Sequence, residues 1–197
     1  MSHVTSFSGC LIPRNRLAAL ERAITMFCPT LEFVKGQKHY RTWKDDHGSF
    51  YGDWKMPDGM NERTAGDNAE HVIRMKPEHA NTKPNIPYEI GVVPMDYNRD
   101  AKGNVILKDG KPQGLHYDVN SPYYALACDS FMQGQGILNE PGVGPAKNHA
   151  DAFGELYRNY QMALSAIIAE EQGHSISFHQ TDDGVHYSVT QVQEVGV

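Results

Sequence analysis

Two stretches of the chain repeat their apolar residues at spacings of three and four, the pattern of an amphipathic helix. The stripe of the first stretch consists of Leu17, Leu20, Ile24 and Phe27. Pro29 follows, so we expect this helix to end just before it. The stripe of the second stretch consists of Phe153, Leu156, Tyr157, Tyr160, Leu164, Ile167 and Ile168. Asn148 or Asp151 is expected to cap its start, and Gly173 to take the left-handed conformation that ends a helix.

Shorter runs rich in apolar and β-branched residues predict strands before, between and after these helices. They lie at residues 4–11, 31–34, 71–75, 88–93, 123–128, 174–180 and 185–192. Because strands and helices follow one another in mixed order, the pattern predicts an α+β fold. We expect a mainly antiparallel sheet of about six strands, with the two amphipathic helices packed on one face.

The last two strands alternate apolar and polar residues around the turn sequence 181–184, which predicts an antiparallel hairpin. In the register that keeps one face apolar, Ile176 lies opposite Val189. His179 then lies opposite His186 on the polar face. Two imidazoles in this position supply half of a tetrahedral metal site, so His179 and His186 are a candidate metal pair that needs further ligands. The alternative is a pair of solvated side chains.

Two segments lack a sustained period, and we interpret them as insertions at 37–69 and 95–120 in a single domain spanning 1–197. The second insertion carries turn signals typical of a polar hairpin arm. The first carries four aromatic residues among charged ones, namely Trp43, Phe50, Tyr51 and Trp54. Acidic neighbours would repel phosphate, so nucleic acid is an unfavourable partner. The rings either anchor the loop on the domain or bind a protein partner, a role that favours Trp and Tyr.

A glycine-rich loop precedes the second helix and is the candidate site for a small anion. Its residues for this role are Gly142, Gly144, Lys147 and His149. The N-terminus of a helix has unpaired N–H groups and a dipole that favours negative charge, and the loop adds a lysine and a histidine. Its spacing is too short for a phosphate-binding P-loop, and Asn148 stands where a P-loop has Ser or Thr. A separate run, GQG at 134–136, does not complete a dinucleotide fingerprint. The alternative is an ordinary loop that leads into the helix.

Composition narrows the class of protein. The 197 residues suffice for one domain with a core, since 40% are hydrophobic, and a formal net charge of -6 disfavours a broad nucleic-acid surface. Three widely spaced cysteines form no disulfide framework, and their apolar neighbours favour small buried side chains. We therefore expect a reducing compartment, either the cytoplasm or an equivalent such as plastid stroma or infected host cytoplasm. No membrane span, secretory signal or cofactor motif is expected.

Short motifs distributed along the chain resemble one family. They are MSHV at 1–4, YEIG at 88–91, LACD at 126–129, FGELYRNY at 153–160, EQGHSI at 171–176 and DG at 183–184. Together they resemble the family named hypothetical chloroplast reading frame thirty-five, a domain of unknown function with members in plastids, cyanobacteria, other bacteria and some bacteriophages. The resemblance covers residues 1–36, 70–93 and 123–192, and 37–69 and 95–120 are elaborations. It implies the α+β fold and a soluble location, and it transfers no active site.

These observations lead to two hypotheses of different classes. The first is a non-enzymatic binding or adaptor protein that presents its aromatic-rich insertions to a protein partner or to a second copy of itself. No catalytic grouping of residues stands out in the sequence. The alternative is a protein, or an enzyme, that binds an anionic small molecule or nucleotide at the glycine-rich loop before the second helix.

Overall fold

The computed structural model describes residues 5–7, 10–47, 58, 66–83, 87–129, 133–144, 152–181 and 184–191. Within this part of the chain the main sheet has the strand order β1-β9-β5-β4-β3, with β2 added on β9 and β8 on β5. Its strands are β1 (Thr5–Phe7), β2 (Ile12–Pro13), β3 (Leu31–Lys35), β4 (His71–Met75), β5 (Ile90–Asp96), β8 (His116–Tyr117) and β9 (Tyr123–Asp129). Every pairing in it is antiparallel, which confirms the predicted α+β class.

Helices and two small hairpins surround this sheet. The helices are η1 (Arg14–Arg16), α1 (Leu17–Phe27), α2 (Trp43–His47), α3 (Pro77–Ala80), α4 (Gln133–Leu138) and α5 (Gly154–Glu171). The hairpins are formed by β6 (Leu107–Lys108) with β7 (Lys111–Pro112) and by β10 (His174–Thr181) with β11 (Gly184–Gln191). No helix in the described residues combines the length and the apolar character needed to cross a membrane.

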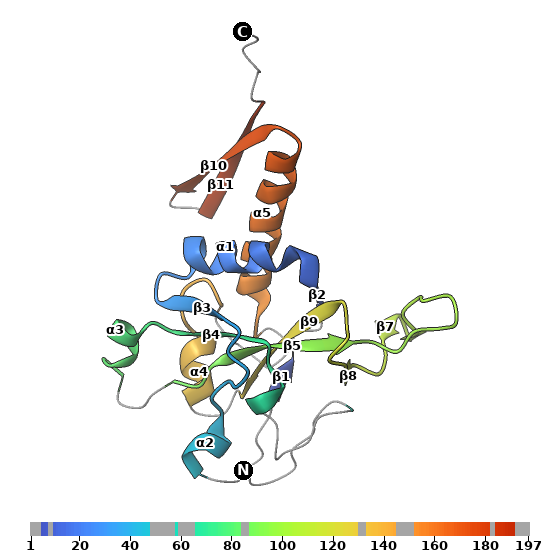
Figure 1. The fold of residues 1–197 in the computed structure, drawn as a ribbon. Coiled ribbons are helices and arrows are strands. Elements are labelled where there is room, and N and C mark those ends of the chain that lie inside the picture. The colour runs from blue at the N-terminus through green and yellow to red at the C-terminus, as the bar shows by residue number, and fades with distance from the viewer. Residues whose placement is uncertain are drawn as a thin grey trace.

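The two amphipathic helices pack on one face of the sheet and form the main core with it. Leu20 and Ile24 of α1 and Leu156 and Tyr160 of α5 are buried there together with strand residues such as Ile73. Figure 1 shows α1 lying across the sheet, while α5 crosses α1 and rises beyond it toward the C-terminal hairpin. Burial of these side chains is the main force that holds the helices in place.

Two arginine–glutamate pairs tie the helices together at the surface. Both terminal nitrogens of Arg22 donate to the Glu170 carboxylate, at 2.7 and 2.8 Å. Arg16 donates to Glu171 at 2.8 Å. Both pairs connect the end of α5 with the segment that contains η1 and α1. Exposed pairs of this kind add little free energy of folding, even where the arginine contact is bidentate.

Helix α5 differs from its prediction in its N-terminal cap and in the last residue of its apolar stripe. Its N-cap is Phe153, with no side-chain cap, and the N–H of Leu156 donates instead to the Val143 carbonyl at 3.1 Å. The expected caps at positions 148 and 151 lie outside the described residues. Ile168, the last residue of the predicted stripe, is 37% exposed. The buried face of α5 instead includes Asn159 and two alanines. Gly173 has a φ of 81° and closes the helix as predicted.

The C-terminal hairpin has the predicted register and stands apart from the main sheet. Ile176 pairs with Val189, and His179 pairs with His186. The hairpin packs on the helices instead, where the ring of Phe178 meets the ring of Phe27 edge to face at 5.7 Å between centroids. This placement covers the end of α1 and part of the upper half of α5 (Figure 1).

The cysteine prediction is confirmed at two positions and wrong at the third. Cys28 and Cys128 are buried thiols, whereas Cys10 is exposed. Cys10 lies in the short connection between β1 and β2, so its apolar neighbour Leu11 packs on the sheet while the thiol does not. The described cysteines form no disulfide with one another.

Candidate functional site

The opposite face of the sheet carries a second and smaller core, to which both insertions contribute. Its buried residues are Tyr40, Ala69, Val72, Val93, Met95, Ala125 and Ala127, and Leu11, Leu115 and Tyr117 pack against them. Tyr40 and Ala69 belong to the first insertion, and Leu115 and Tyr117 to the second. We call this covered side of the sheet, with the insertion residues on it, the insertion face.

The first insertion begins and ends in a closed stem. The Tyr40 N–H donates to the Gly66 carbonyl at 2.9 Å, which brings the two ends of the segment together. His39 lies between two carboxylates, with Nε2 at 2.8 Å from Asp45 and Nδ1 at 2.7 Å from Asp67. A backbone hydrogen bond and two histidine–carboxylate contacts therefore hold the two ends of the first insertion together.

Tyr40 and Trp43 hold this stem on the sheet. The Tyr40 ring is fully buried over Gly91, where any added Cβ would lie 2.4 Å from the ring. The backbone N–H of Trp43, at the start of α2, donates to the buried carboxylate of Asp129 at 2.9 Å. Trp43 thus lies on the anchored base of the insertion. The other three aromatic residues predicted to bind a partner, Phe50, Tyr51 and Trp54, lie outside the described residues.

The second insertion meets the first at Asp58. Asp58 forms a parallel bridge with His116, and its carbonyl accepts the N–H of Tyr117 at 2.8 Å. His116 and Tyr117 form β8, which pairs with the end of β5. The sequence treats the insertions as separate segments, but the structure joins them into one surface on one side of the sheet.

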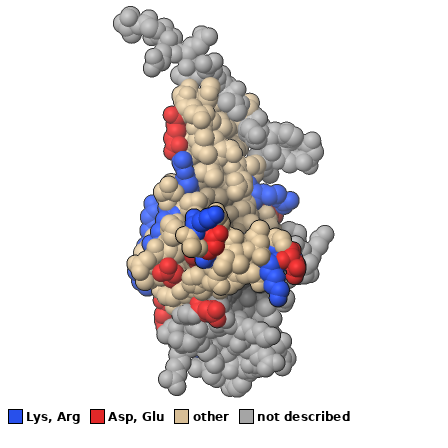
Figure 2. All heavy atoms as spheres, turned by 90° about the vertical axis from the view of Figure 1, so that its right-hand side faces the viewer, with Lys and Arg blue, Asp and Glu red and all other residues tan. Residues whose placement is uncertain are grey.

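From this junction the second insertion extends as the predicted hairpin, which we call the arm (98–114). At its tip Asp109 and Gly110 have φ values of 52° and 73°, the paired left-handed residues of a tight hairpin turn. Leu107, Ile106 and, at the base, Val119 are 59%, 45% and 54% exposed. On the side of the molecule from which the arm projects, charges of both signs are interspersed with uncharged residues (Figure 2).

An ion pair fixes the base of the arm. The guanidinium of Arg99 donates to both Asp96 oxygens, at 2.9 and 2.8 Å, and lies 5.2 Å from the ring centre of Tyr123. Burial acts to raise the pKa of Asp96, but the hydrogen bonds from Arg99 and from the Tyr97 N–H outweigh it and lower the pKa. The carboxylate therefore stays charged and keeps the arm attached to β5.

His39, the histidine of the stem, makes the free energy of unfolding depend on pH. Burial acts to lower the pKa of His39, but the hydrogen bonds and charges of Asp67 and Asp45 outweigh it, so the pKa is raised above 6.5. Both ring nitrogens face carboxylates, which only the doubly protonated imidazolium satisfies. Because the folded state binds the proton more tightly, the stabilisation is fully present below pH 6.5 and is lost as the pH rises through the raised pKa.

His39→Gln should remove this dependence. We expect the unfolding free energy of the wild type, minus that of the variant, to fall steadily from about pH 6 to about pH 8 in urea denaturation. Comparison with the variant is needed because burial lowers the pKa of His71, which gives a slope of the opposite sign. A difference that stays constant across this range would contradict the charged stem.

A second polar network attaches η1 to the sheet. The Glu70 carboxylate accepts from Arg14 at 2.9 and 3.1 Å and from the Tyr124 hydroxyl at 2.6 Å. The Arg14 guanidinium also lies 4.8 Å from the centre of the Tyr124 ring. Nothing in the sequence indicates this group, because its members are far apart along the chain. Each charge has a partner within the network, which makes its role structural.

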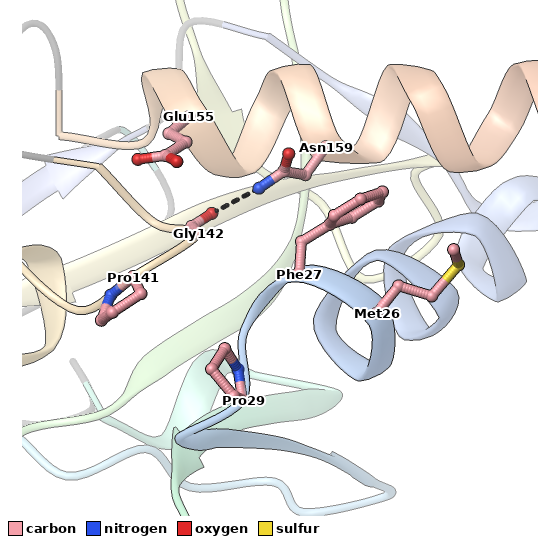
Figure 3. Close-up of a pocket in the computed structure, with 7 residues that line it drawn as sticks. All are labelled: Met26, Phe27, Pro29, Pro141, Gly142, Glu155 and Asn159. Carbon is pink, nitrogen blue, oxygen red and sulfur yellow. Dashed lines mark hydrogen bonds between the residues drawn. The ribbon is translucent and has the colours of Figure 1, made fainter. Parts of the chain in front are cut away.

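The glycine-rich loop forms one wall of a pocket. Met26, Phe27, Pro29, Pro141, Gly142, Glu155 and Asn159 line a cavity of about 380 Å³ between the end of α1 and the start of α5 (Figure 3). Gly142 accepts a hydrogen bond from the Asn159 amide at 2.9 Å. Gly144 has a φ of 119° and lies against Glu155. Lys147 and His149, predicted with them, lie outside the described residues.

The candidate metal pair stays a prediction. The backbone of the hairpin places His179 directly opposite His186, but their side chains lie outside the described residues. Elsewhere in the part of the chain that the structure describes, no group of three histidine, cysteine or acidic residues is arranged to hold a metal ion.

Comparison with known proteins gives no relative: no family model, no curated protein and no solved structure matches this chain.

Proposed function

We propose that this protein is a non-enzymatic binding or adaptor protein that presents its two insertions, as one surface, to a protein partner or to a second copy of itself. The observation that carries the proposal is the junction at Asp58, where the two insertions bridge, together with the packing of described residues from both insertions on the same face of the sheet. An elaboration that served only to cover the core would not need two joined segments.

The distribution of apolar side chains supports the same proposal. Leu107 and Ile106 are exposed on a two-stranded arm that has little core of its own, where burial against a partner would gain free energy. Aliphatic residues surrounded by mixed charges are typical of a protein interface. Contacts of Tyr40, Trp43 and His39 hold the stem of the aromatic-rich insertion on the domain.

The family resemblance enters as a second proposal. We propose that the core formed by 1–36, 70–93 and 123–192 belongs with the chloroplast reading frame thirty-five proteins. The two insertions fall between these stretches, which agrees with an inherited core and an added binding surface. The buried thiols of Cys28 and Cys128 suit the reducing compartment that we propose for it.

Self-association gives the first test of this function. We expect wild-type protein to form assemblies of a whole number of chains in native mass spectrometry and in sedimentation velocity. Ile106→Ser with Leu107→Ser should shift these to the mass of one chain, because both side chains would lose a buried environment. Trp43→Ala with Trp54→Ala should do the same from the other insertion without unfolding the domain.

Ile168→Ser is the matched control. Ile168 is an exposed aliphatic residue on α5, away from the insertion face, so its replacement should leave the assembly unchanged. An assembly that survives both insertion variants, or that only Ile168→Ser dissociates, would contradict the proposed surface. A wild type that stays a single chain at every concentration would overturn self-association. A photo-crosslinker at position 107, compared with one at position 168, would then test for a different protein partner.

A further inference from the structure

We propose that the pocket between α1 and α5 binds a small organic cation, a protonated amine carried on an apolar body. This inference goes beyond the proposed function, since the pocket lies on the helical side of the sheet. Its volume of about 380 Å³ falls within the range of pockets that hold small ligands.

The described lining of the pocket combines apolar side chains with polar groups, and the only charged residue in it is acidic. Met26, Phe27, Pro29 and Pro141 provide the hydrocarbon surface. Glu155 and Asn159 come from successive turns of α5 and lie on the side of the helix that faces Pro141 and Gly142 (Figure 3). A ligand that fills this space buries its apolar body and places its polar head near the Glu155 carboxylate.

The Glu155 carboxylate is unpaired among the described residues: none of them forms an ion pair with it or donates to its oxygens. The described lysines beside the pocket are committed elsewhere. Lys76 donates to the Pro29 carbonyl at 2.6 Å, and Lys83 pairs with Glu140 at 3.0 Å. A half-buried carboxylate that has no counter-charge in the described part of the chain favours a cationic ligand.

Behind the lining residue Gly142 lies a thiol that also carries no charge. The sulfur of buried Cys28 is 2.7 Å from the position that a Cβ on Gly142 would take. Burial, and after it the negative charge of Glu155, raises the pKa of the Cys28 thiol to about 12, so the thiol stays neutral. Among the described residues around the pocket, none therefore offsets the negative charge of Glu155, an arrangement that disfavours anions.

Hydrogen bonds within the chain hold the walls of the pocket in place. The Asn159 amide donates to the Gly142 carbonyl at 2.9 Å, and the Leu156 N–H donates to the Val143 carbonyl at 3.1 Å. These bonds hold the loop against the first turns of α5. Binding then costs little conformational entropy, since the walls do not have to be ordered. The glycine-rich loop was predicted from the sequence to bind an anion, but the described residues of the pocket favour a cation.

Three six-carbon probes test the charge preference in the full protein. Hexylamine, hexanol and hexanoate have cationic, neutral and anionic head groups at pH 7, and their affinities can be measured by ligand-observed NMR titration. We expect hexylamine to bind about five- to tenfold more tightly than hexanol, and hexanoate to bind most weakly. Glu155→Gln should make hexylamine and hexanol equal.

Glu78→Gln is the matched control, because Glu78 also lies in the first turn of a helix but outside the pocket. It should keep the amine preference. Met26→Gln, which alters only the apolar wall, should weaken hexylamine and hexanol alike and leave their ratio unchanged. Equal binding of all three probes, no binding of hexylamine at about 10 mM, or an amine preference that survives Glu155→Gln would overturn the proposal. None of these outcomes depends on the insertion face.

Discussion

Gly142→Ala should lower the free energy of unfolding by about 3 kcal/mol or more, the largest effect expected of a single methyl group in this protein. Gly142 has a φ of +85°, a conformation that costs an L-residue energy. Its Cβ would also lie 2.2 Å from the Phe27 carbonyl oxygen, and backbone cannot rotate away as a side chain can. Urea denaturation followed by circular dichroism measures the loss.

Gly36→Ala separates the two causes. Gly36 has a φ of +76° but no atom within 4 Å of its added Cβ, so only the conformational cost remains. We expect a loss of about 1 kcal/mol. The excess of the Gly142 variant over this value reports the close packing of the loop on α1. Equal losses at the two positions would show that the contact with Phe27 is absent in solution.

Gly91→Ala should cost about 2 to 3 kcal/mol for a purely steric reason. Gly91 lies on β5 with ordinary strand geometry, and its Cβ would lie 2.4 Å from the buried ring of Tyr40. The ring has to move off the sheet, and the stem of the first insertion moves with it. We therefore expect both a lower unfolding free energy and a weaker assembly, measured by denaturation and by sedimentation velocity.

A double-mutant cycle with Tyr40→Leu tests the cause. The smaller side chain leaves room for the methyl group, so Gly91→Ala should cost clearly less in the Tyr40→Leu background than in the wild type. Costs that add to within about 0.5 kcal/mol would contradict the contact. A weaker assembly without loss of stability would instead mean that Tyr40 acts at the interface and not as an anchor.

Much of the fold could be predicted because its signals are local. The alternation of the last two strands around one turn was enough to pair Ile176 with Val189. The strand at His71–Met75 was predicted at the bounds that the structure has. Gly173 marked the end of α5 because few other residues take its φ of 81° without cost. Each of these features depends on residues close in sequence.

Other features depend on packing that no local pattern contains. Helix α4 contains two glycines in six residues, which predicts a loop, yet Ile137 and Leu138 are buried in the core and hold it helical. Asn159 was not expected on the buried face of α5, where it binds the Gly142 carbonyl. The aromatic cluster indicated the first insertion, but the bridge from Asp58 to His116 joins distant segments by backbone.

The pocket depends both on a local sequence signal and on packing between distant segments. Gly142 was singled out as a ligand residue from its loop, and it does line the cavity. Glu155 reads in the sequence as an ordinary first-turn glutamate, which stabilises a helix through the dipole. Only the approach of α1, which brings Phe27 and Pro29 to the same space, shows that this carboxylate faces a cavity.

The order of the strands also determines when a growing chain can fold. Strand β1 pairs with β9, so that Thr5 meets Asp129, and α5 follows later still. During synthesis β3, β4 and β5 can pair as soon as they leave the ribosome, because they are neighbours in the sheet. The outer edge of β5 stays open until β9 arrives, and the helical face stays without α5. The nascent protein therefore carries an unprotected strand edge while residues 97–129 are being added, and this is the stage at which chaperone binding or aggregation should compete with folding.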